Sequence, residues 1–340
     1  MLIVFWLKFA VLSDFLHMSI LQVSDELPPL KQLASHPYGT LDRRVQFAKK
    51  DSAIAVFDTK QHTSRISQHF GQFGRDDGEF YRPAGVAVSN LGEIHVADTG
   101  NQRIQVFDNN GVFLRSFTTR INGYTQSCPT GVAVVGNMFL VTDPVNNAVN
   151  MFDFRGKFTG HFGEDSIFER PASIAVDRTY GVVAISDQLG VRVFSAKGER
   201  SEAEDIMTAG HVGPMANEVA CNGRGEILVS CWYDHCVKVY DLNSGFKTRI
   251  GGRGEWLGRL ERPRGVGVDK QGKIVVSDAG NRRVQLFDPR DRLGFCRLVA
   301  APADGLREPY GVQALFDGRF VVVDNALSKV FSVSKSRCEP

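Results

Sequence analysis

The stretch ADTGNQRIQVFD, residues 97–108, recurs with few changes as SDAGNRRVQLFD, residues 277–288. Such recurrence indicates a repeat protein, in which each copy is one supersecondary unit. Aligned on this phrase, the 340-residue chain contains six copies, each opened by an apolar run that begins at a proline, as in RPAGVAVS or RPRGVGVD. The leading prolines are Pro83, Pro129, Pro171, Pro214, Pro263 and Pro309, at intervals of 42 to 49 residues.

Each copy holds up to four short apolar runs, separated by turns rich in Gly, Asn and Asp. This pattern predicts one four-stranded antiparallel blade per copy, and therefore an all-β, six-bladed β-propeller. The sixth copy stops after its third run, near Val333, whereas SRISQHFG, residues 64–71, has the pattern of a fourth strand that belongs to no other blade. We expect this N-terminal strand to complete the last blade, because an open seam would leave an unpaired edge.

The predicted propeller spans residues 64–340, and residues 1–63 lie outside it. The apolar start MLIVFWLKFAVLSDFLHMSILQ has no basic segment before it and is interrupted by Lys8 and Asp14. These features do not favour a secretory signal or a membrane span. We expect residues 1–63 to be disordered or loosely docked, and we expect no membrane partner.

Charge and cysteine content narrow the functional classes. The 40 basic and 38 acidic side chains give a formal net charge of +2, so a nucleic-acid site would have to be a local patch. None of the six cysteines forms a C-x-x-C pair, which excludes a RING or B-box zinc module within the chain and gives no reason to predict a metal or another cofactor. Scattered thiols favour a reducing compartment, and we expect a cytoplasmic protein.

The repeated phrase places an aspartate at the end of the second run, with Asn and Arg three and five residues later. A carboxylate there can accept backbone N–H groups of the following turn and can pair with the arginine. Similar aspartates spread around a ring cannot all belong to one catalytic centre, so we assign them a structural role in the turns. They are Asp98, Asp143, Asp187, Asp278 and Asp324; Cys231 replaces the aspartate in the fourth copy.

Antiparallel topology places the loop that enters a blade and the loop between its second and third strands on one face. Binding residues often lie on loops that a rigid scaffold holds, so a site is expected on this loop-rich face. Around the fifth copy, arginines and aromatic residues outnumber acidic ones, which suits phosphates and stacked bases. The candidate RNA- or partner-binding residues are Arg253, Trp256, Arg259, Arg262, Arg264, Arg282 and Arg283, with Tyr310 and Lys329 from the sixth copy and Arg82 and Arg103 from the first. The competing interpretation is an ordinary charged surface, with arginines paired to Glu255 and Glu261 at little gain in stability.

A secreted propeller enzyme of lyase or lactonase type is the less favoured interpretation. Such chemistry needs a metal site or an acid–base pair on the inner strands. The inner runs GVAVS, GVAVV, SIAVD, EVACN, GVGVD and GVQAL contain no histidine. His95 and His235 are expected to be packing or surface residues, and no catalytic residue is predicted.

The copies resemble the NHL repeat at the C-terminus of the tripartite-motif NHL proteins. The resemblance is carried by GRDDGEFYRPAGVAV, residues 74–88, and IHVADTGNQRIQVFDNNGVFLRSF, residues 94–117; it is weakest in the third copy, where the turn after Asp187 is short. It implies a non-enzymatic propeller whose loop-rich face binds single-stranded RNA in post-transcriptional regulation. The alternative that it implies is a protein-binding module that recruits substrates in the ubiquitin ligase pathway. Ligase activity would then require a RING from another chain or a longer isoform.

Overall fold

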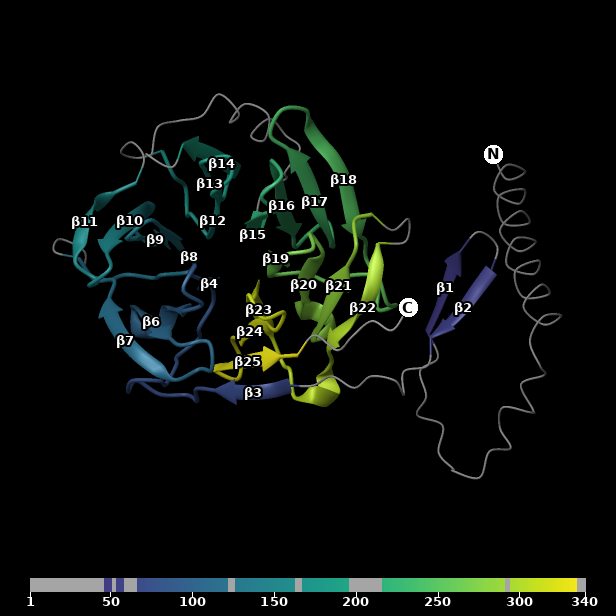
Figure 1. Cartoon of the computed structure of the whole chain (residues 1–340), viewed down its shortest axis with the longest axis horizontal. Coiled ribbons are helices and arrows are strands. Elements are labelled where there is room, and N and C mark those ends of the chain that lie inside the picture. The colour runs from purple at the N-terminus through teal and green to yellow at the C-terminus, as the bar shows by residue number, and fades with distance from the viewer. Residues whose placement is uncertain are drawn as a thin grey trace, which may run out of the picture. The chain divides into compact units, whose positions relative to one another are not determined.

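The computed structural model of this chain describes residues 46–50, 53–57, 66–121, 126–162, 167–195, 216–290 and 294–334. Six antiparallel sheets follow one another around a common axis, which confirms the predicted six-bladed β-propeller (Figure 1). Five blades have four strands, and the described part of blade 3 has three. The fourth run of that copy and the leading Pro214 of the next lie outside the described residues.

Blade 1 contains β4 (Val86–Val88), β5 (Ile94–Asp98), β6 (Arg103–Phe107) and β7 (Phe113–Thr118). Blade 2 contains β8 (Val132–Val135), β9 (Met138–Asp143), β10 (Ala148–Asp153) and β11 (Phe158–His161). Blade 3 contains β12 (Ser173–Asp177), β13 (Val182–Asp187) and β14 (Gly190–Ser195).

Blade 4 contains β15 (Ala216–Cys221), β16 (Glu226–Cys231), β17 (Cys236–Asp241) and β18 (Gly245–Gly251). Blade 5 contains β19 (Val266–Val268), β20 (Ile274–Asp278), β21 (Arg283–Phe287) and β22 (Phe295–Ala300). Blade 6 contains β23 (Pro309–Ala314), β24 (Phe320–Asp324), β25 (Lys329–Val333) and the N-terminal strand β3 (Ile66–Phe70).

The hydrophobic core lies between adjacent blades. The second strands β5, β20 and β24 are buried along their whole length, as a continuous apolar run predicts for a strand covered on both faces. Val237 and Val239 of blade 4, for example, pack with Val266, Val276 and Phe287 of blade 5. Each blade therefore buries its apolar surface against its two neighbours, which stabilise it.

The first strands of the six blades surround the axis. They contact one another in the order β4, β8, β12, β15, β19 and β23, and β23 returns to β4. Glycine permits this close approach: a Cβ atom at Gly265 would lie 2.1 Å from the carbonyl oxygen of Tyr310, and one at Gly85 would lie 2.4 Å from that of Thr130. The channel along the axis is consequently narrow at these glycines.

The N-terminal strand closes the ring. Residues of β3 pair antiparallel with β25, with Phe70 opposite Val330 and Ile66 opposite Val333. This pairing confirms the closure that the sequence predicted.

Within residues 1–63, the structure describes one antiparallel hairpin, β1 (Gln46–Lys50) and β2 (Ala53–Phe57), which the sequence prediction did not include. The rest of that segment lies outside the described residues, so the domain boundary at residue 63 stays a prediction. In the part of the chain that is described, no helix has the length and apolar character needed to span a bilayer.

Candidate binding surface at the mouth of the central channel

The recurring aspartates hold the loops of the loop-rich face together. Asp278 is fully buried, and its carboxylate accepts hydrogen bonds from Arg283 Nε (2.7 Å), Asn281 Nδ2 (2.9 Å) and the backbone N–H of Glu261 (2.6 Å). Burial raises the pKa of Asp278, and the nearby Arg283 charge and the hydrogen bonds act in the opposite direction. The carboxylate thereby joins the turn after β20 to the loop that enters blade 5.

Asp98 has the same role in blade 1. It accepts from Arg103 Nε (2.8 Å) and from the backbone N–H of Tyr81 (2.8 Å). In blades 1 and 5 the backbone N–H therefore comes from the loop before the blade, whereas the sequence argument placed it in the turn that follows the aspartate. Asp187 does bond that turn, through the N–H groups of Leu189 (2.8 Å) and Gly190 (3.0 Å).

Asp143 and Asp324 complete the set without an arginine partner at the same position. Asp143 accepts from Ser127 Oγ at 2.9 Å, and Asp324 accepts from the backbone N–H groups of Arg307 at 2.7 Å and Leu327 at 3.0 Å. All five carboxylates thus bond the entering loop, the turn after the second strand, or both. This arrangement confirms that the two kinds of loop share one face in blades 1, 2, 3, 5 and 6.

An alternating stack of arginine and aromatic side chains lies on this face across blades 4, 5 and 6. The Arg264 guanidinium carbon is 4.7 Å from the ring centroid of Tyr310 and 5.7 Å from that of Trp232. Arg262 covers the same Trp232 ring at 4.8 Å. We call Tyr310, Arg264, Trp232 and Arg262 the arginine–aromatic stack. Cation–π contacts of this kind are worth about 0.5–1 kcal/mol each at exposed sites, so the stack is ordered yet can rearrange.

Backbone contacts position the stack. The N–H of Arg262 donates to His235 Nδ1 at 3.1 Å, and Arg262 has a left-handed backbone with φ of +50°. Such a backbone is uncommon for a residue other than glycine, but it recurs at Arg82 and Arg170, which also precede the leading proline of their blades, so it belongs to the repeat. Glu261 lies between Arg253 and His235, with 3.5 Å from its carboxylate to Arg253 Nε and to His235 Nδ1. The acidic side chain therefore offsets part of the local positive charge.

The stack borders a cavity of about 140 Å³ on the propeller axis. All six blades contribute to its lining, which consists of Ala84, Gly85, Thr130, Ala172, Ser173, Glu218, Arg264, Tyr310 and Gly311. Glu218 is the acidic member, and burial raises its pKa well above the ordinary value, which favours the neutral acid. The mouth of the channel therefore combines arginines, aromatic rings and a carboxyl group that resists ionisation.

The remaining predicted residues fall into four groups. Arg283 is buried and also donates to the carbonyl oxygens of Glu255 (2.7 Å) and Trp256 (2.9 Å), so it supports the loop and is not accessible to a ligand. Arg103 has the equivalent place in blade 1, with 13% of its side chain exposed. The sequence prediction that Arg283 would join an exposed patch with Arg262 is wrong, because the ion pair with Asp278 draws its side chain inward.

Arg282 and Lys329 come together elsewhere, in a groove of about 610 Å³ between blades 5 and 6 that Arg307 and Asp304 also line. Arg253, Trp256 and Arg259 are exposed on the loop that enters blade 5. Arg82 occupies in blade 1 the place of Arg262, again directly before a proline and with φ of +53°.

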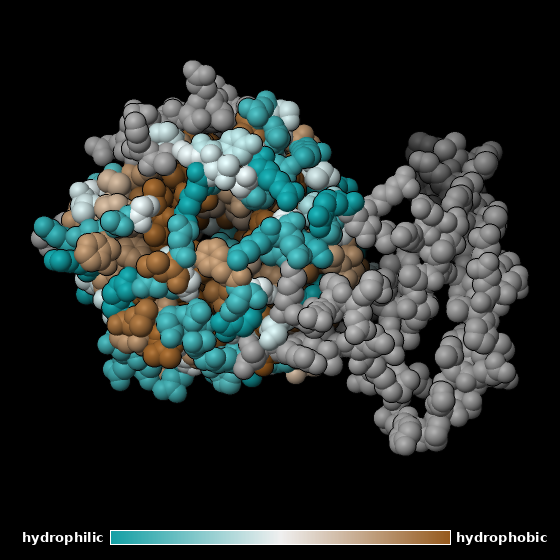
Figure 2. All heavy atoms as spheres, viewed as in Figure 1, coloured by the Kyte–Doolittle hydropathy of each residue, from teal (hydrophilic) through white to brown (hydrophobic). Residues whose placement is uncertain are grey.

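The sequence prediction did not include Trp232 or Glu218, and it assigned His235 to packing or to the surface. Trp232 and His235 stand in the turn SCWYDHC of blade 4, which the topology argument had already placed on the loop-rich face. This turn contains no arginine, whereas the loops of blade 5 contain several, so an argument from arginine content selects blade 5. Glu218 could also have been identified from the sequence, since it is the charged residue of the inner strand β15. Figure 2 shows the face in view as a mixture of hydrophilic and hydrophobic residues, without one continuous patch of either kind.

The fold and this surface define a six-bladed β-propeller with an arginine-rich, aromatic mouth. Within that class, the chain carries NHL repeats: the profile of the NHL repeat matches residues 80–107 and 260–287. These segments run from the entering loop to the third strand of blades 1 and 5.

The curated relatives are NHL proteins. Protein brain tumor of Drosophila melanogaster is 32% identical over 134 residues, which cover 38% of this chain and 13% of that protein. B-box type zinc finger protein ncl-1 of Caenorhabditis elegans is 31% identical over 120 residues, 34% of this chain and 14% of that protein. Human E3 ubiquitin-protein ligase TRIM32 is 23% identical over 281 residues, 75% of this chain and 42% of that protein. The matched region is less than half the length of each relative.

Solved structures share the fold at low identity. A Bacteroides thetaiotaomicron protein of unknown function has a TM-score of 0.63 at 13% identity, covering 86% of this chain and 83% of its own. A virginiamycin B lyase from Staphylococcus aureus has a TM-score of 0.55 at 11% identity, with coverages of 84% and 86%. Likeness at these identities extends to the fold alone.

Proposed function

We propose that the chain is a non-enzymatic binding platform, and that the mouth of the loop-rich face binds single-stranded RNA in post-transcriptional regulation in the cytoplasm. The observation that carries this proposal is the arginine–aromatic stack. Planar guanidinium groups and aromatic rings are the surfaces on which unpaired bases stack, and arginine also pairs with phosphate. The relatives with NHL repeats support the choice of a binding module over an enzyme.

The stack supports a specific mode of binding. Arg262 has 58% of its side chain exposed and can leave Trp232 for a phosphate at small cost, which opens the indole face to a base. Arg264 contacts the rings of both Trp232 and Tyr310, so it is expected to remain in place and to offer the edge of its guanidinium group to the RNA. The ligand would therefore insert bases next to Trp232 and Tyr310 while its backbone follows the arginines.

The test is a fluorescence anisotropy titration of the full chain with pools of short labelled single-stranded RNAs. Trp232→Ala and Tyr310→Ala should each weaken binding by about 1–3 kcal/mol, the usual value for the loss of one base–aromatic contact. The matched control is Phe154→Ala with Arg155→Ala, a cation–π pair (5.3 Å) in the turn after β10 on the opposite face. This control should bind as the wild type does. A wild-type chain that binds none of the RNA pools sinks the RNA proposal.

A protein partner is the second candidate, and an exposed aromatic pair favours it. Phe73 is 70% exposed, and its ring meets that of Tyr81 edge-on at 5.5 Å in the loop that enters blade 1. Exposed aromatic residues of this kind are typical of protein-binding hot spots. If a protein such as a substrate of the ubiquitin pathway binds this face, Phe73→Ala should reduce capture of that protein strongly. The same change should leave RNA binding at the stack unaltered.

A further inference from the structure

Blade 4 replaces the recurring aspartate–arginine pair with two cysteines. In blades 1, 3 and 5, the aspartate that ends the second strand pairs with an arginine five residues later. The corresponding residues in blade 4 are Cys231, which ends β16, and Cys236, which begins β17. Both are buried, carry free thiols and lie opposite each other across the hairpin. Two sulfur atoms, which are soft metal ligands, therefore take the place of the aspartate–arginine ion pair that recurs in blades 1, 3 and 5.

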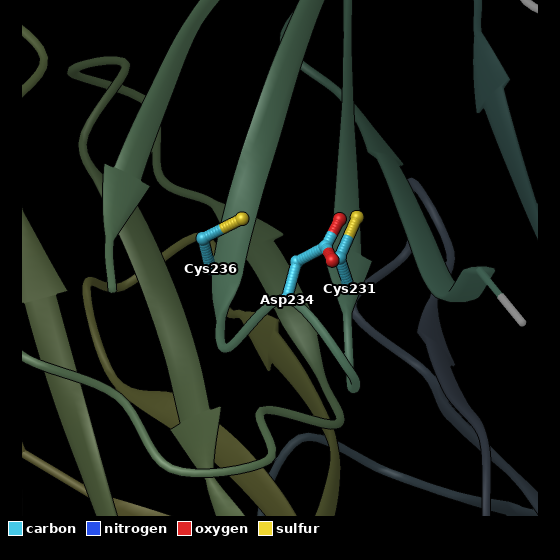
Figure 3. Close-up of side chains that lie close together, drawn as sticks. All are labelled: Cys231, Asp234 and Cys236. Carbon is cyan, nitrogen blue, oxygen red and sulfur yellow. The ribbon is translucent and has the colours of Figure 1, made fainter. Parts of the chain in front are cut away.

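The turn between the cysteines adds a carboxylate. Figure 3 shows Asp234 projecting from the turn toward Cys231, with the Cys236 sulfur directed toward the same region. The two Sγ atoms and a carboxylate oxygen of Asp234 all lie within 4.8 Å of one another. Two sulfurs of a tetrahedral zinc site, with Zn–S bonds of about 2.3 Å, are about 3.8 Å apart. The three ligand atoms thus lie within about 1 Å of the separations that such a site requires.

The charges around the cluster suit a divalent cation bound by thiolates. Lys238 Nζ lies 2.7 Å from the Asp234 carboxylate and so adds one positive charge beside the cluster. A divalent ion with two thiolates and one carboxylate has a net charge of −1, which Lys238 neutralises.

We propose that Cys231, Asp234 and Cys236 form a binding site for a soft divalent cation of the zinc class. Two cysteines and one carboxylate leave the fourth tetrahedral position to water, as in zinc sites with three protein ligands. The spacing C-x-x-D-x-C lacks a C-x-x-C pair, which explains why the sequence prediction of no metal did not detect it. The cation would fix the turn that carries Trp232 and His235. This inference does not depend on RNA binding.

The test uses cobalt(II) as a spectroscopic probe in the full chain, freed of metal and kept reduced by a phosphine. One equivalent should produce a sulfur-to-cobalt charge-transfer band in the near ultraviolet and the intense visible bands of a tetrahedral site. Zinc should displace both. Cys231→Ser and Cys236→Ser should each weaken the charge-transfer band, and the double substitution should abolish it. Asp234→Asn should retain sulfur coordination but lower the affinity at least tenfold.

The matched control is Cys221→Ser, which changes another thiol of blade 4, in β15, and should leave the spectrum unaltered. Because a substituted turn can impair folding, a second measurement uses unaltered cysteines. Cobalt should quench the fluorescence of the adjacent Trp232 in a chain with Trp6→Phe and Trp256→Phe, which retains Trp232 as its one tryptophan. A folded, reduced wild-type chain without the sulfur band overturns the proposal. So does a band that survives the double substitution, or a cysteine pair that forms a disulfide but binds no cobalt after reduction.

Discussion

Asp278 keeps a carboxylate inside the propeller beside a buried arginine. The pair connects two loops, because Arg283 also donates hydrogen bonds to the backbone carbonyl oxygens of Glu255, Trp256 and Arg259. Removing one partner from such a buried pair leaves the other charge without compensation, which is far more costly than losing an exposed ion pair. The structural role predicted for the repeated aspartates can therefore be tested at this residue.

Asp278→Ala should lower the free energy of unfolding by about 3–5 kcal/mol, because Arg283 would stay buried without its carboxylate. The measurement is urea denaturation followed by circular dichroism. Asp288→Ala is the matched control, since Asp288 pairs with the exposed Arg290 in the next turn of the same blade and should cost about 1 kcal/mol. Equal losses for the two variants would contradict the role assigned to Asp278.

His95 gives a pH-dependent prediction. It is buried against Phe139, neither ring nitrogen has a hydrogen-bond partner, and burial lowers its pKa to about 4. The unfolded chain, with a histidine pKa near 6.5, takes up the proton first as the pH falls. The contribution of His95 to stability is therefore present above about pH 6.5 and is lost as the pH falls toward 4.

Between pH 7 and pH 4.5, the free energy of unfolding should fall by about 2–3 kcal/mol more in the wild type than in His95→Phe. Unfolding free energies of both chains at the two pH values provide the measurement. Glu93 lies 3.8 Å from His95 Nε2 and can titrate differently in the variant, whereas carboxylates far from His95 titrate alike in the two chains and cancel in the comparison. An identical acid loss in the variant would show that His95 is already protonated, or accessible to water, in the folded chain.

At the scale of the element, β3 is the strand whose removal has the clearest consequence. Without it, β25 becomes a sheet edge, and Val330, Phe331 and Val333 lose their partners. Deleting residues 64–71 should cause aggregation or a large fall in melting temperature, because an unpaired apolar edge invites pairing with another chain. Light scattering and thermal melting are the measurements. Deleting residues 1–45 should leave the melting temperature nearly unchanged; equal effects of the two deletions would contradict the closure scheme.

The elements themselves were largely predictable from the sequence. Apolar runs bounded by Gly, Asn and Asp turns specify strands locally, so the blade strands and the closing strand follow from the pattern. Contacts between turns were not predictable in the same way. Trp232, Arg264 and Tyr310 belong to three different blades, and their stacking depends on how far each side chain reaches across a blade boundary. Arg283 was misassigned for a different reason: its spacing from Asp278 already indicated an ion pair, but it was also counted among the candidate binding arginines of blade 5.

At the scale of the whole molecule, the near balance of charge limits the electrostatic part of RNA binding. The formal net charge is +2, and Glu261 offsets some of the positive charge near the mouth. About three phosphate contacts would give a slope of about −2 for log affinity against log salt, with 0.7 per phosphate on a single strand. Affinity should then fall only about fifteenfold between 50 and 200 mM salt.

The anisotropy titration repeated at several salt concentrations measures that slope. Arg262→Ala should make it shallower by about 0.7, whereas Trp232→Ala should leave it unchanged, because stacking involves no counterion release. Arg155→Ala on the opposite face is the control. A wild-type slope as steep as −6 would mean that a much larger basic surface binds the RNA than the stack provides.

The pairing of β3 with β25 also has a consequence for synthesis on the ribosome. The strand β3 emerges before the strands of blades 1 to 5, but its partner β25 is translated only about 260 residues later, which takes roughly 13 to 50 s at 5–20 residues per second. During that time blades 1 to 5 can assemble in order, while β3 remains an unpaired strand attached to a growing protein. Pairing of β25 with β3 is then the event that closes the ring. A nascent chain stalled before Lys329 would leave this strand exposed to neighbouring polysomes and available to chaperones.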